Sequence, residues 1–251
     1  MLKIRVIPCL LLRDGGLVKT ENFKNPRYLG DPTNAVKIFN KKEVDELIFI
    51  DIQASKNKTE PNWEVIEDLA SECFMPLGYG GGINSFEQIK RLIKIGVEKV
   101  IINQEALKNP DFITKAVEHF GTSTIVCAVD IKKNMWGKYE VFDHVKGKLT
   151  GLSPLDYIMK LEKLGVGEVF INNVNREGTF GGIDFDIVET IVNKISMPLI
   201  ICGGVSSLSD ISLAAKAGVS AIAVGSMFVF QGPHRAVLIS YPSPEDLKKI
   251  I

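Results

Sequence analysis

The stretch "GYGGGINSFEQIKRLIKIGVEKVIIN", residues 78–103, returns later in the chain as "ICGGVSSLSDISLAAKAGVSAIAVGS", residues 201–226. Both copies run from a glycine cluster through a serine and a helical stretch to a glycine-valine turn and an apolar strand. The spacing is also kept, because Gly82 precedes Asn103 by as many residues as Gly204 precedes Gly225. A repeat of this kind indicates a chain built from two similar halves.

Outward from the repeat, short apolar runs rich in β-branched residues predict eight buried strands. They cover residues 4–10, 47–52, 74–79, 99–103, 123–130, 168–173, 197–202 and 220–225. Helical periodicity separates most of them. Residues 85–96 end at a glycine and place four apolar side chains, Phe86, Ile89, Leu92 and Ile93, on one face; residues 153–165 open with a capping serine and a first-turn proline.

Strands that alternate with helices predict a parallel sheet with right-handed crossovers. Eight such units in 251 residues predict the α/β class and a closed (β/α)8 TIM barrel. We expect one domain over residues 1–251, built from duplicated half-barrels of about 1–120 and 121–251. An open doubly wound sheet is the alternative.

The longest irregular stretches, residues 11–32 and 131–152, follow equivalent strands of the two halves. Within the second, residues 136–151 alternate like a small hairpin. Long loops at matched strand ends are where a barrel places its functional residues, so we expect the site there.

Composition excludes several classes of protein. Thirty basic residues balance thirty acidic ones, so no basic surface is expected for nucleic acid or an anionic membrane. The first residues lack a cleavage site and the ~20 apolar residues that span a bilayer, and we expect a cytoplasmic protein.

The cysteines lie in or beside apolar runs, which predicts buried, reduced thiols; they are Cys9, Cys73, Cys127 and Cys202. The histidines lack metal-ligand spacing, so neither a metal nor another cofactor is expected; they are His119, His144 and His234.

Glycine-rich turns predict two phosphate sites. Residues 80–83 ("GGGI") and 202–205 ("CGGV") follow the third and seventh strands and let backbone N–H groups approach an anion. Residues 225–228 ("GSMF") open a short helix where barrels often bind phosphate, and Asn103 holds the matching place in the first half. These glycines could serve tight turns alone, but their recurrence favours an elongated ligand with a phosphate at each end.

Motifs along the whole chain carry a family resemblance. They are "RVIPCL" (5–10), "GDP" (30–32), "GGGI" (80–83), "GTSTIVCAVD" (121–130), "TGL" (150–152), "REGT" (176–179), "GGV" (203–205) and "GSMF" (225–228). In this order they resemble the cyclase (synthase) subunit family of imidazole glycerol phosphate synthase, from histidine biosynthesis. The resemblance implies a duplicated half-barrel that receives ammonia from a separate glutaminase subunit and uses it to split and cyclise a doubly phosphorylated ribonucleotide.

The resemblance implies two catalytic aspartates, after strands one and five, acting as general base and general acid. Asp130 matches the second, but Leu11 stands at the first and can neither hold nor pass a proton. Asp14 could substitute by looping back, although it precedes two glycines and is typical of a turn. Lys19 and Asp51 match the family's first-loop lysine and its inward-facing carboxylate.

The family's phosphate sites fall on Gly81, Gly82, Asn103, Gly178, Thr179, Gly203, Gly204, Gly225 and Ser226. Gln104 replaces the family's usual hydroxyl residue after the fourth strand. Asn175 and Glu177 replace two aspartates, so we expect both beside the second phosphate loop.

Four charged residues stand at strand starts and match the family's ammonia gate; they are Arg5, Glu46, Lys99 and Glu168. Any one of them could be ordinary solvated charge. Together, two positive and two negative side chains can close a narrow pore, because each satisfies a neighbour's charge.

The missing aspartate and the tail "GPHRAVLISYP" (232–242) resemble a subgroup of cyclase-like proteins associated with sugar amidation in O-antigen and related surface polysaccharides. The predicted function is therefore a cyclase-like subunit of a glutamine-dependent amidotransferase complex. Its implied partners are a glutaminase subunit in a heterodimer, a sugar amidotransferase and a phosphorylated small molecule. A true cyclase that tolerates Leu11 and a non-catalytic, ammonia-conducting scaffold are the alternatives, so enzymatic activity of the chain itself stays open.

Overall fold

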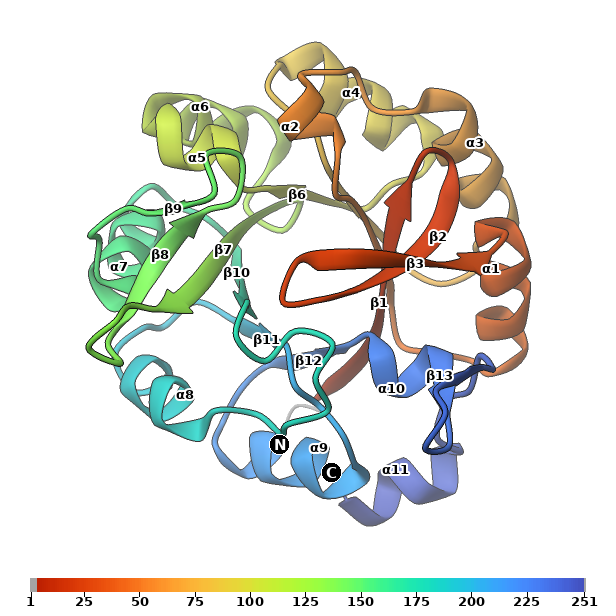
Figure 1. Ribbon diagram of the computed structural model, residues 1–251. Coiled ribbons are helices and arrows are strands. Elements are labelled where there is room, and N and C mark those ends of the chain that lie inside the picture. Colours follow the sequence, from red (N-terminus) through yellow and green to blue (C-terminus); the bar gives the residue numbers. More distant parts are fainter. Residues whose placement is uncertain (1–3, 251) are drawn as a thin grey trace.

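The computed structural model describes residues 4–250 as a closed barrel of parallel strands ringed by helices (Figure 1). Within this range the ring runs β1 (Arg5–Arg13), β4 (Leu47–Asp51), β5 (Leu77–Gly80), β6 (Lys99–Ile102), β7 (Ile125–Lys133), β10 (Glu168–Asn173), β11 (Leu199–Cys202) and β12 (Ala221–Val224). Pairings of β7 with β10 and of β12 with β1 close it. The predicted TIM barrel is confirmed, and the open doubly wound sheet is wrong. Residues 1–3 and 251 of the predicted domain lie outside the described range.

The strand predictions hold in position but not in every boundary. β1 continues to Arg13, beyond the predicted end at residue 10. β5 and β11 begin at Leu77 and Leu199, after the residues with which their predicted runs opened. A proline lies just before each of these starts, and proline lacks the N–H that strand pairing needs.

Helices cover the outside of the barrel (Figure 1). The longer ones are α1 (Pro32–Lys41), α3 (Trp63–Glu72), α4 (Phe86–Ile95), α6 (Pro110–Phe120), α7 (Pro154–Lys163), α8 (Phe185–Val192) and α9 (Leu208–Lys216). Shorter ones are α2 (Ala54–Asn57), α5 (Gln104–Lys108), α10 (Ser226–Val229) and α11 (Pro244–Ile250). Ser85 and Ser207 close capping boxes at the starts of α4 and α9, so the repeated serines do the same work in both halves. One detail was wrong: Ile93 is exposed rather than part of the buried face of α4.

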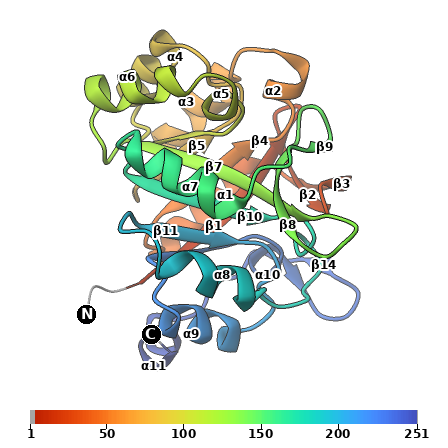
Figure 2. The ribbon, with the colours of Figure 1, turned by 90° about the vertical axis from the view of Figure 1, so that its left-hand side faces the viewer.

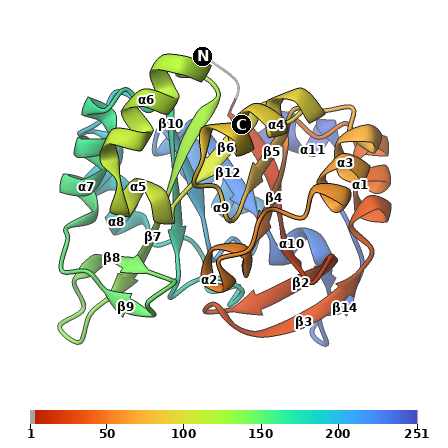
Figure 3. The ribbon, with the colours of Figure 1, turned by 90° about the horizontal axis from the view of Figure 1, so that it is seen from above.

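Two hairpins project from the end of the barrel at which the strands finish (Figures 2 and 3). β2 (Gly16–Glu21) and β3 (Lys24–Gly30) form the first, so the expectation of an irregular stretch over residues 11–32 was wrong. β8 (Tyr139–Asp143) and β9 (Lys148–Leu149) form the second, as the alternation predicted. A small pairing of β13 (Phe230–Gln231) with β14 (Ala236–Val237) lies in the tail.

Two apolar cores hold the barrel together. The larger lies between the strands and the helices, and the smaller fills the barrel interior. The interior core consists of Ile7, Cys9, Ile48, Ile101, Val126, Phe170, Ile200, Ala221 and Ala223. The thiol prediction needs correction: Cys9 and Cys127 are buried, whereas Cys73 and Cys202 are only half-buried. No helix within residues 4–250 is long and apolar enough to cross a bilayer.

Candidate functional site at the barrel mouth

A cavity of about 210 Å³ lies at the carboxyl ends of the strands. The predicted site residues that line it are Lys19, Asp51, Gly81, Gly82, Asn103, Asp130, Gly178, Gly203, Gly204, Gly225 and Ser226. Thr179 is not among its lining residues, and the Thr179 hydroxyl donates to the Arg176 carbonyl at 2.8 Å within its own loop. The structure therefore gathers both predicted phosphate loops and the predicted carboxylates around one cavity.

The two halves of the barrel line this cavity with different chemistry. In the first half, strand register aligns Leu11, Ile50, Gly80 and Ile101. The equivalent row of the second half is Asp130, Asn172, Cys202 and Ala223. Leu11 and Asp130 thus occupy matching places, and the hydrogen-bonding groups of this row lie in the second half.

Within residues 4–250, no other carboxylate takes the position at which the family has its first aspartate. Asp14 lies in a turn with a φ of 52°, is exposed and pairs with Arg13 at 3.2 Å. Asp51 lines the cavity, but its Oδ1 accepts hydrogen bonds from the backbone N–H groups of Gln53 (2.8 Å) and Ala54 (3.0 Å). Asp51 therefore holds the start of α2 as well as facing the cavity.

Asp130 contacts two side chains, Asn103 and His144. Its Oδ2 lies 2.9 Å from the Asn103 amide nitrogen and 3.1 Å from His144 Nδ1. Burial of the imidazole opposes its positive charge, but the hydrogen bond and charge of Asp130 outweigh burial and raise the pKa of His144. Sequence analysis missed His144, since it tested the histidines only for metal spacing. The available signal was the position of His144 in the predicted hairpin after the Asp130 strand.

Lys19 reaches the cavity from the first hairpin and pairs with Glu177 from the loop after β10. Both side chains are buried, and burial lowers the pKa of Lys19 to about 8. The same Glu177 carboxylate accepts the Phe23 N–H at 3.1 Å, and Asn22 donates its side-chain amide to the Val174 and Asn175 carbonyls. These contacts fasten the first hairpin across the mouth. Glu177 was expected beside the second phosphate loop, but its pairing with Lys19 was not.

Close backbone packing requires the loop glycines. A Cβ on Gly81 would lie 2.6 Å from the Asp51 carbonyl oxygen, and one on Gly204 would lie 2.1 Å from that of Gly182. Both have positive φ angles, of 126° and 98°. The buried Ser226 hydroxyl at the start of α10 has no hydrogen-bond partner within residues 4–250. An unpaired buried hydroxyl facing a cavity is suited to a ligand oxygen.

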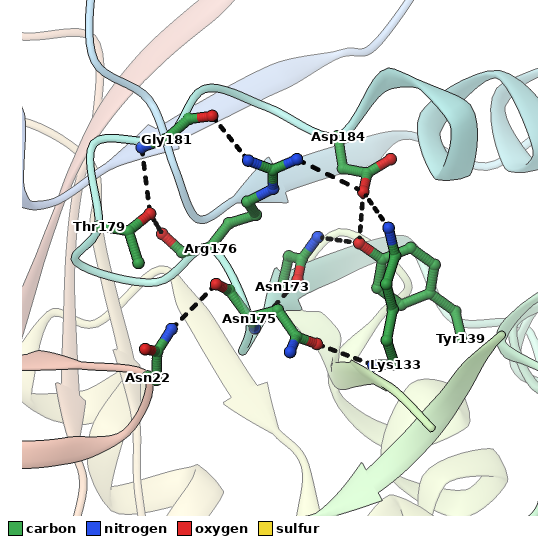
Figure 4. Close-up of polar contacts among 9 residues, drawn as sticks. All are labelled: Asn22, Lys133, Tyr139, Asn173, Asn175, Arg176, Thr179, Gly181 and Asp184. Carbon is green, nitrogen blue, oxygen red and sulfur yellow. Dashed lines mark hydrogen bonds and ion pairs between the residues drawn. The ribbon is translucent and has the colours of Figure 1, made fainter. Parts of the chain in front are cut away.

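A polar network supports the loop after β10 from behind (Figure 4). The buried Asp184 carboxylate accepts from Lys133 Nζ at 2.9 Å and from the Tyr139 hydroxyl at 2.7 Å, and Arg176 lies 3.9 Å away. Asn173 donates to the Tyr139 oxygen at 2.7 Å. The network ties the second hairpin to the loop that carries Gly178 and Glu177.

At the opposite end of the barrel the four charged residues form a closed ring. Arg5 pairs with Glu46 at 2.5 Å and also with Glu168. Lys99 contacts the same two carboxylates, at 3.1 Å and 2.7 Å. Burial opposes the charge of Arg5, but the two glutamates raise its pKa overall. Every cation of the ring thus contacts both anions.

The interior core lies between this ring and the cavity. Cys9, Ile101, Phe170 and Ala223 belong to the core and also line the cavity. Gly78 faces the same interior, where a Cβ would lie 3.0 Å from Ile48 Cγ1. The barrel axis is therefore apolar from the charged ring to the cavity floor. No cluster of His, Cys, Asp or Glu in the described part of the chain could hold a metal ion.

Comparison with known proteins places the chain in a family. The model of the family described as "Histidine biosynthesis protein" matches residues 5–234. A Pseudomonas aeruginosa protein, provisionally named imidazole glycerol phosphate synthase subunit hisF2, is 49% identical over 98% of this chain and 99% of its own. A Leptospira interrogans protein, provisionally named subunit HisF, is 45% identical over 98% of each chain. Imidazole glycerol phosphate synthase subunit HisF of Streptomyces coelicolor is 35% identical over 91% of each chain. The chain therefore belongs to the histidine biosynthesis protein family, among the HisF-like subunits of imidazole glycerol phosphate synthase.

Proposed function

We propose that this HisF-like chain is the ammonia-receiving subunit of a glutamine-dependent amidation complex in surface polysaccharide biosynthesis. A separate glutaminase binds the strand-N-terminal face, and its ammonia passes along the barrel axis toward amidation of a sugar. The observation that carries the proposal is one axis joining a closed charged ring, an apolar interior and a cavity that has Asp130 but not its partner aspartate.

The charged ring supports conduction of a neutral molecule. Its two cations and two anions contact one another, so the ring carries no net charge and presents little attraction to passing ions. Beyond it, an apolar interior disfavours a charged solute by several kcal/mol or more, because no water remains to solvate the charge. Neutral ammonia meets a much smaller penalty than ammonium on this route.

The cavity supports a phosphorylated ligand rather than ring closure of the histidine-pathway intermediate. Its two glycine loops and the unpaired Ser226 hydroxyl offer donors to anionic oxygens at opposite sides of the mouth. Cyclisation in the family uses acid and base groups from both halves, and Leu11 removes one of them. The tail over residues 232–242 supports the polysaccharide-associated subgroup. Relatives of 42–49% identity carry the names hisF2 and hisF3, which fits an additional copy of the subunit.

The test supplies ammonium salt and the bis-phosphorylated histidine-pathway intermediate to the purified protein. Ammonium replaces the glutaminase, so its absence cannot explain a negative result. We expect no cyclised product above background, while a HisF cyclase assayed in parallel turns over. The same protein, mixed with a glutaminase subunit and a sugar amidotransferase, should support glutamine-dependent amidation.

A cyclase that tolerates Leu11 is the second candidate, and the retained Lys19 and Asp130 in the cavity favour it. It predicts turnover close to that of the parallel HisF enzyme, which would overturn the amidation role. A silent scaffold predicts instead that amidation continues unchanged when Asp130 is replaced by asparagine.

A further inference from the structure

We propose that His144 is the residue that transfers protons in this cavity and that Asp130 is its positioning residue. The proposal rests on the proposed function, in that ammonia must reach the cavity. It assigns a role to a side chain of the second hairpin and changes the role expected of Asp130.

The geometry of Asp130 carries the proposal. Its Oδ2 accepts a hydrogen bond from the Asn103 side-chain amide at 2.9 Å and lies 3.1 Å from His144 Nδ1, which has no other polar partner within residues 4–250. The side chain of Asp130 is also largely buried, with 8% of its surface exposed. A carboxylate fixed in this way is poorly placed to take a further proton from a ligand. It is well placed to keep the proton of a neutral imidazole on Nδ1.

That tautomer leaves the lone pair on Nε2. Within residues 4–250, Nε2 of His144 has no hydrogen-bond partner, and the ring lines the cavity with 22% of its surface exposed. The arrangement therefore has the parts of an oriented general base: a carboxylate, an imidazole held at one nitrogen, and a second nitrogen available to a ligand.

The chemical step follows from the nature of ammonia. When its nitrogen lone pair forms a bond to an electrophilic carbonyl carbon of a bound ligand, the nitrogen becomes positively charged and must lose a proton. Nε2 accepts that proton, and the imidazolium that results lies against the Asp130 carboxylate. The imidazolium returns this proton to the former carbonyl oxygen, which becomes a hydroxyl group. A second proton moves from nitrogen to that hydroxyl group by the same route, so the C–O bond breaks, water leaves and a C=N bond forms. No oxidant or further reactant is needed.

The groups around His144 favour this cycle. Asp130 on β7 and Asp143 beside it on β8 stabilise the imidazolium, whereas Lys108 on α5 opposes it. The Asp143 carboxylate is itself engaged by the backbone N–H groups of Val145 and Lys146, so Asp130 remains the direct partner.

The first test needs no substrate. Nitrogen-15 NMR of the histidine side chains gives the tautomer and pKa of His144 in the isolated protein. We expect neutral His144 to carry its proton on Nδ1 and to titrate above an ordinary histidine. Replacing Asp130 with asparagine should lower that pKa while the His119 and His234 signals stay in place. A proton on Nε2 in the neutral form, or a titration unmoved by the substitution, overturns the proposal.

The second test uses the complete amidation complex with glutamine or ammonium. His144→Gln should slow product formation ~10²-fold or more, the usual cost of losing a general base. Asp130→Asn should slow it too, but add little in the His144→Gln background. The His234→Gln variant, in the exposed tail, serves as the control, and thermal unfolding confirms that each variant is folded.

The results of these two tests distinguish a failure of the His144 proposal from a failure of the proposed function. If His144→Gln leaves amidation unchanged while glutamine-dependent amidation itself is present, ammonia delivery stands and the His144 role is wrong. If Asp130→Asn is as damaging without His144 as with it, Asp130 transfers the proton itself and the assignment is also wrong. If amidation is never detected, the proposed function fails, and the NMR test still decides the pairing.

Discussion

Two residues at equivalent register positions separate this chain from a symmetric acid–base site. Leu11 on β1 and Asp130 on β7 both line the mouth cavity. They occupy equivalent positions in the strand registers of the two half-barrels. A leucine excludes water and offers no exchangeable proton, so of these two positions only the one held by Asp130 carries a group that can exchange a proton. The asymmetry arises from side chains rather than from the backbone, because strand pairing is the same in both rows.

Leu11→Asp tests whether this difference alone prevents cyclisation. With ammonium and the bis-phosphorylated intermediate, we expect the variant to gain measurable turnover where the natural protein has none. Loss of one acid–base partner removes ~10²–10⁴-fold in rate, so a gain within that range is expected. Leu10→Asp would be disruptive in the buried core, and Leu152→Asp, on an exposed side chain, is the better control. No gain would mean that Gln104, Asn175 or Glu177 has also altered the site.

Lys19 should leave a signature in the pH dependence of stability. Burial lowers its pKa from 10.5 to about 8, so between these pH values the unfolded chain binds a proton that the folded chain lacks. The contribution of Lys19 to the free energy of unfolding therefore rises as the pH goes from about 8 to 10.5. Comparing urea unfolding of the natural protein with that of Lys19→Met should show a relative gain of about 1–3 kcal/mol from pH 8 to pH 10. A constant difference would mean that Glu177 keeps Lys19 fully protonated throughout.

At the scale of elements, the hairpin of β2 and β3 decides access to the cavity. It crosses the mouth above the strand ends (Figure 1) and is joined to the loop after β10 by Lys19, Asn22 and Phe23. The same loop is supported from behind by the Asp184 network, so the hairpin closes onto a rigid partner. Opening for a ligand must therefore break the Lys19–Glu177 pair.

Gly178→Ala should displace the hairpin. An alanine Cβ there would lie 2.2 Å from the Thr20 carbonyl oxygen, and Gly178 has a φ of 78°. Gly147→Ala is a matched control, because Gly147 has a φ of 66° and no atom within 4 Å of the added Cβ. Both variants carry backbone strain of about 1 kcal/mol, and only the first adds a clash. Faster amide hydrogen exchange over residues 16–30 is expected for Gly178→Ala alone; equal exchange in the two variants would contradict the closed hairpin.

The sequence predicted elements better than it predicted contacts between loops. The serine caps, glycine turns and strand ends depend on local residue order, and the repeat made each visible twice. The Lys19–Glu177 pair joins residues 158 positions apart in the chain. The Asp130–His144 pair is closer in the chain, but it depends on how the second hairpin folds back, which no periodicity specifies. The β2–β3 hairpin was missed because its second strand, "KNPRYLG", is polar and mostly exposed, without the apolar alternation that indicates a buried strand. The roles of the predicted phosphate and gate residues stay predictions.

At the scale of the whole molecule, the barrel has two ends with different chemistry. One end holds the closed charged ring, and the other holds the glycine loops that line the cavity. Both hairpins lie at the cavity end (Figure 3). An apolar interior lies between the two ends, which is the arrangement that the proposed passage of ammonia requires. This polarity supports a glutaminase at the strand-N-terminal face, around Arg5, Glu46, Glu98 and Lys99, and an acceptor at the mouth.

Lys99→Ala tests the connection between the two ends. Removing the lysine breaks its contacts with Glu46 and Glu168 but leaves Arg5 bound to both, so the ring loosens while the surface that meets the glutaminase is little changed. We expect glutaminase binding within about twofold of the natural protein, because the Lys99 side chain is only 19% exposed and is already paired with both glutamates, so it offers little surface to a partner. The readout is the ratio of glutamate released to amidinated sugar formed, with and without external ammonium. This ratio should rise severalfold for Lys99→Ala in the presence of glutamine, and product formed from external ammonium should be unaffected or increased.

Lys94→Ala, an exposed lysine of α4 outside the ring, should behave like the natural protein. A ratio that Lys99→Ala leaves unchanged would mean that the ring is surface charge only and that ammonia reaches its acceptor by another route.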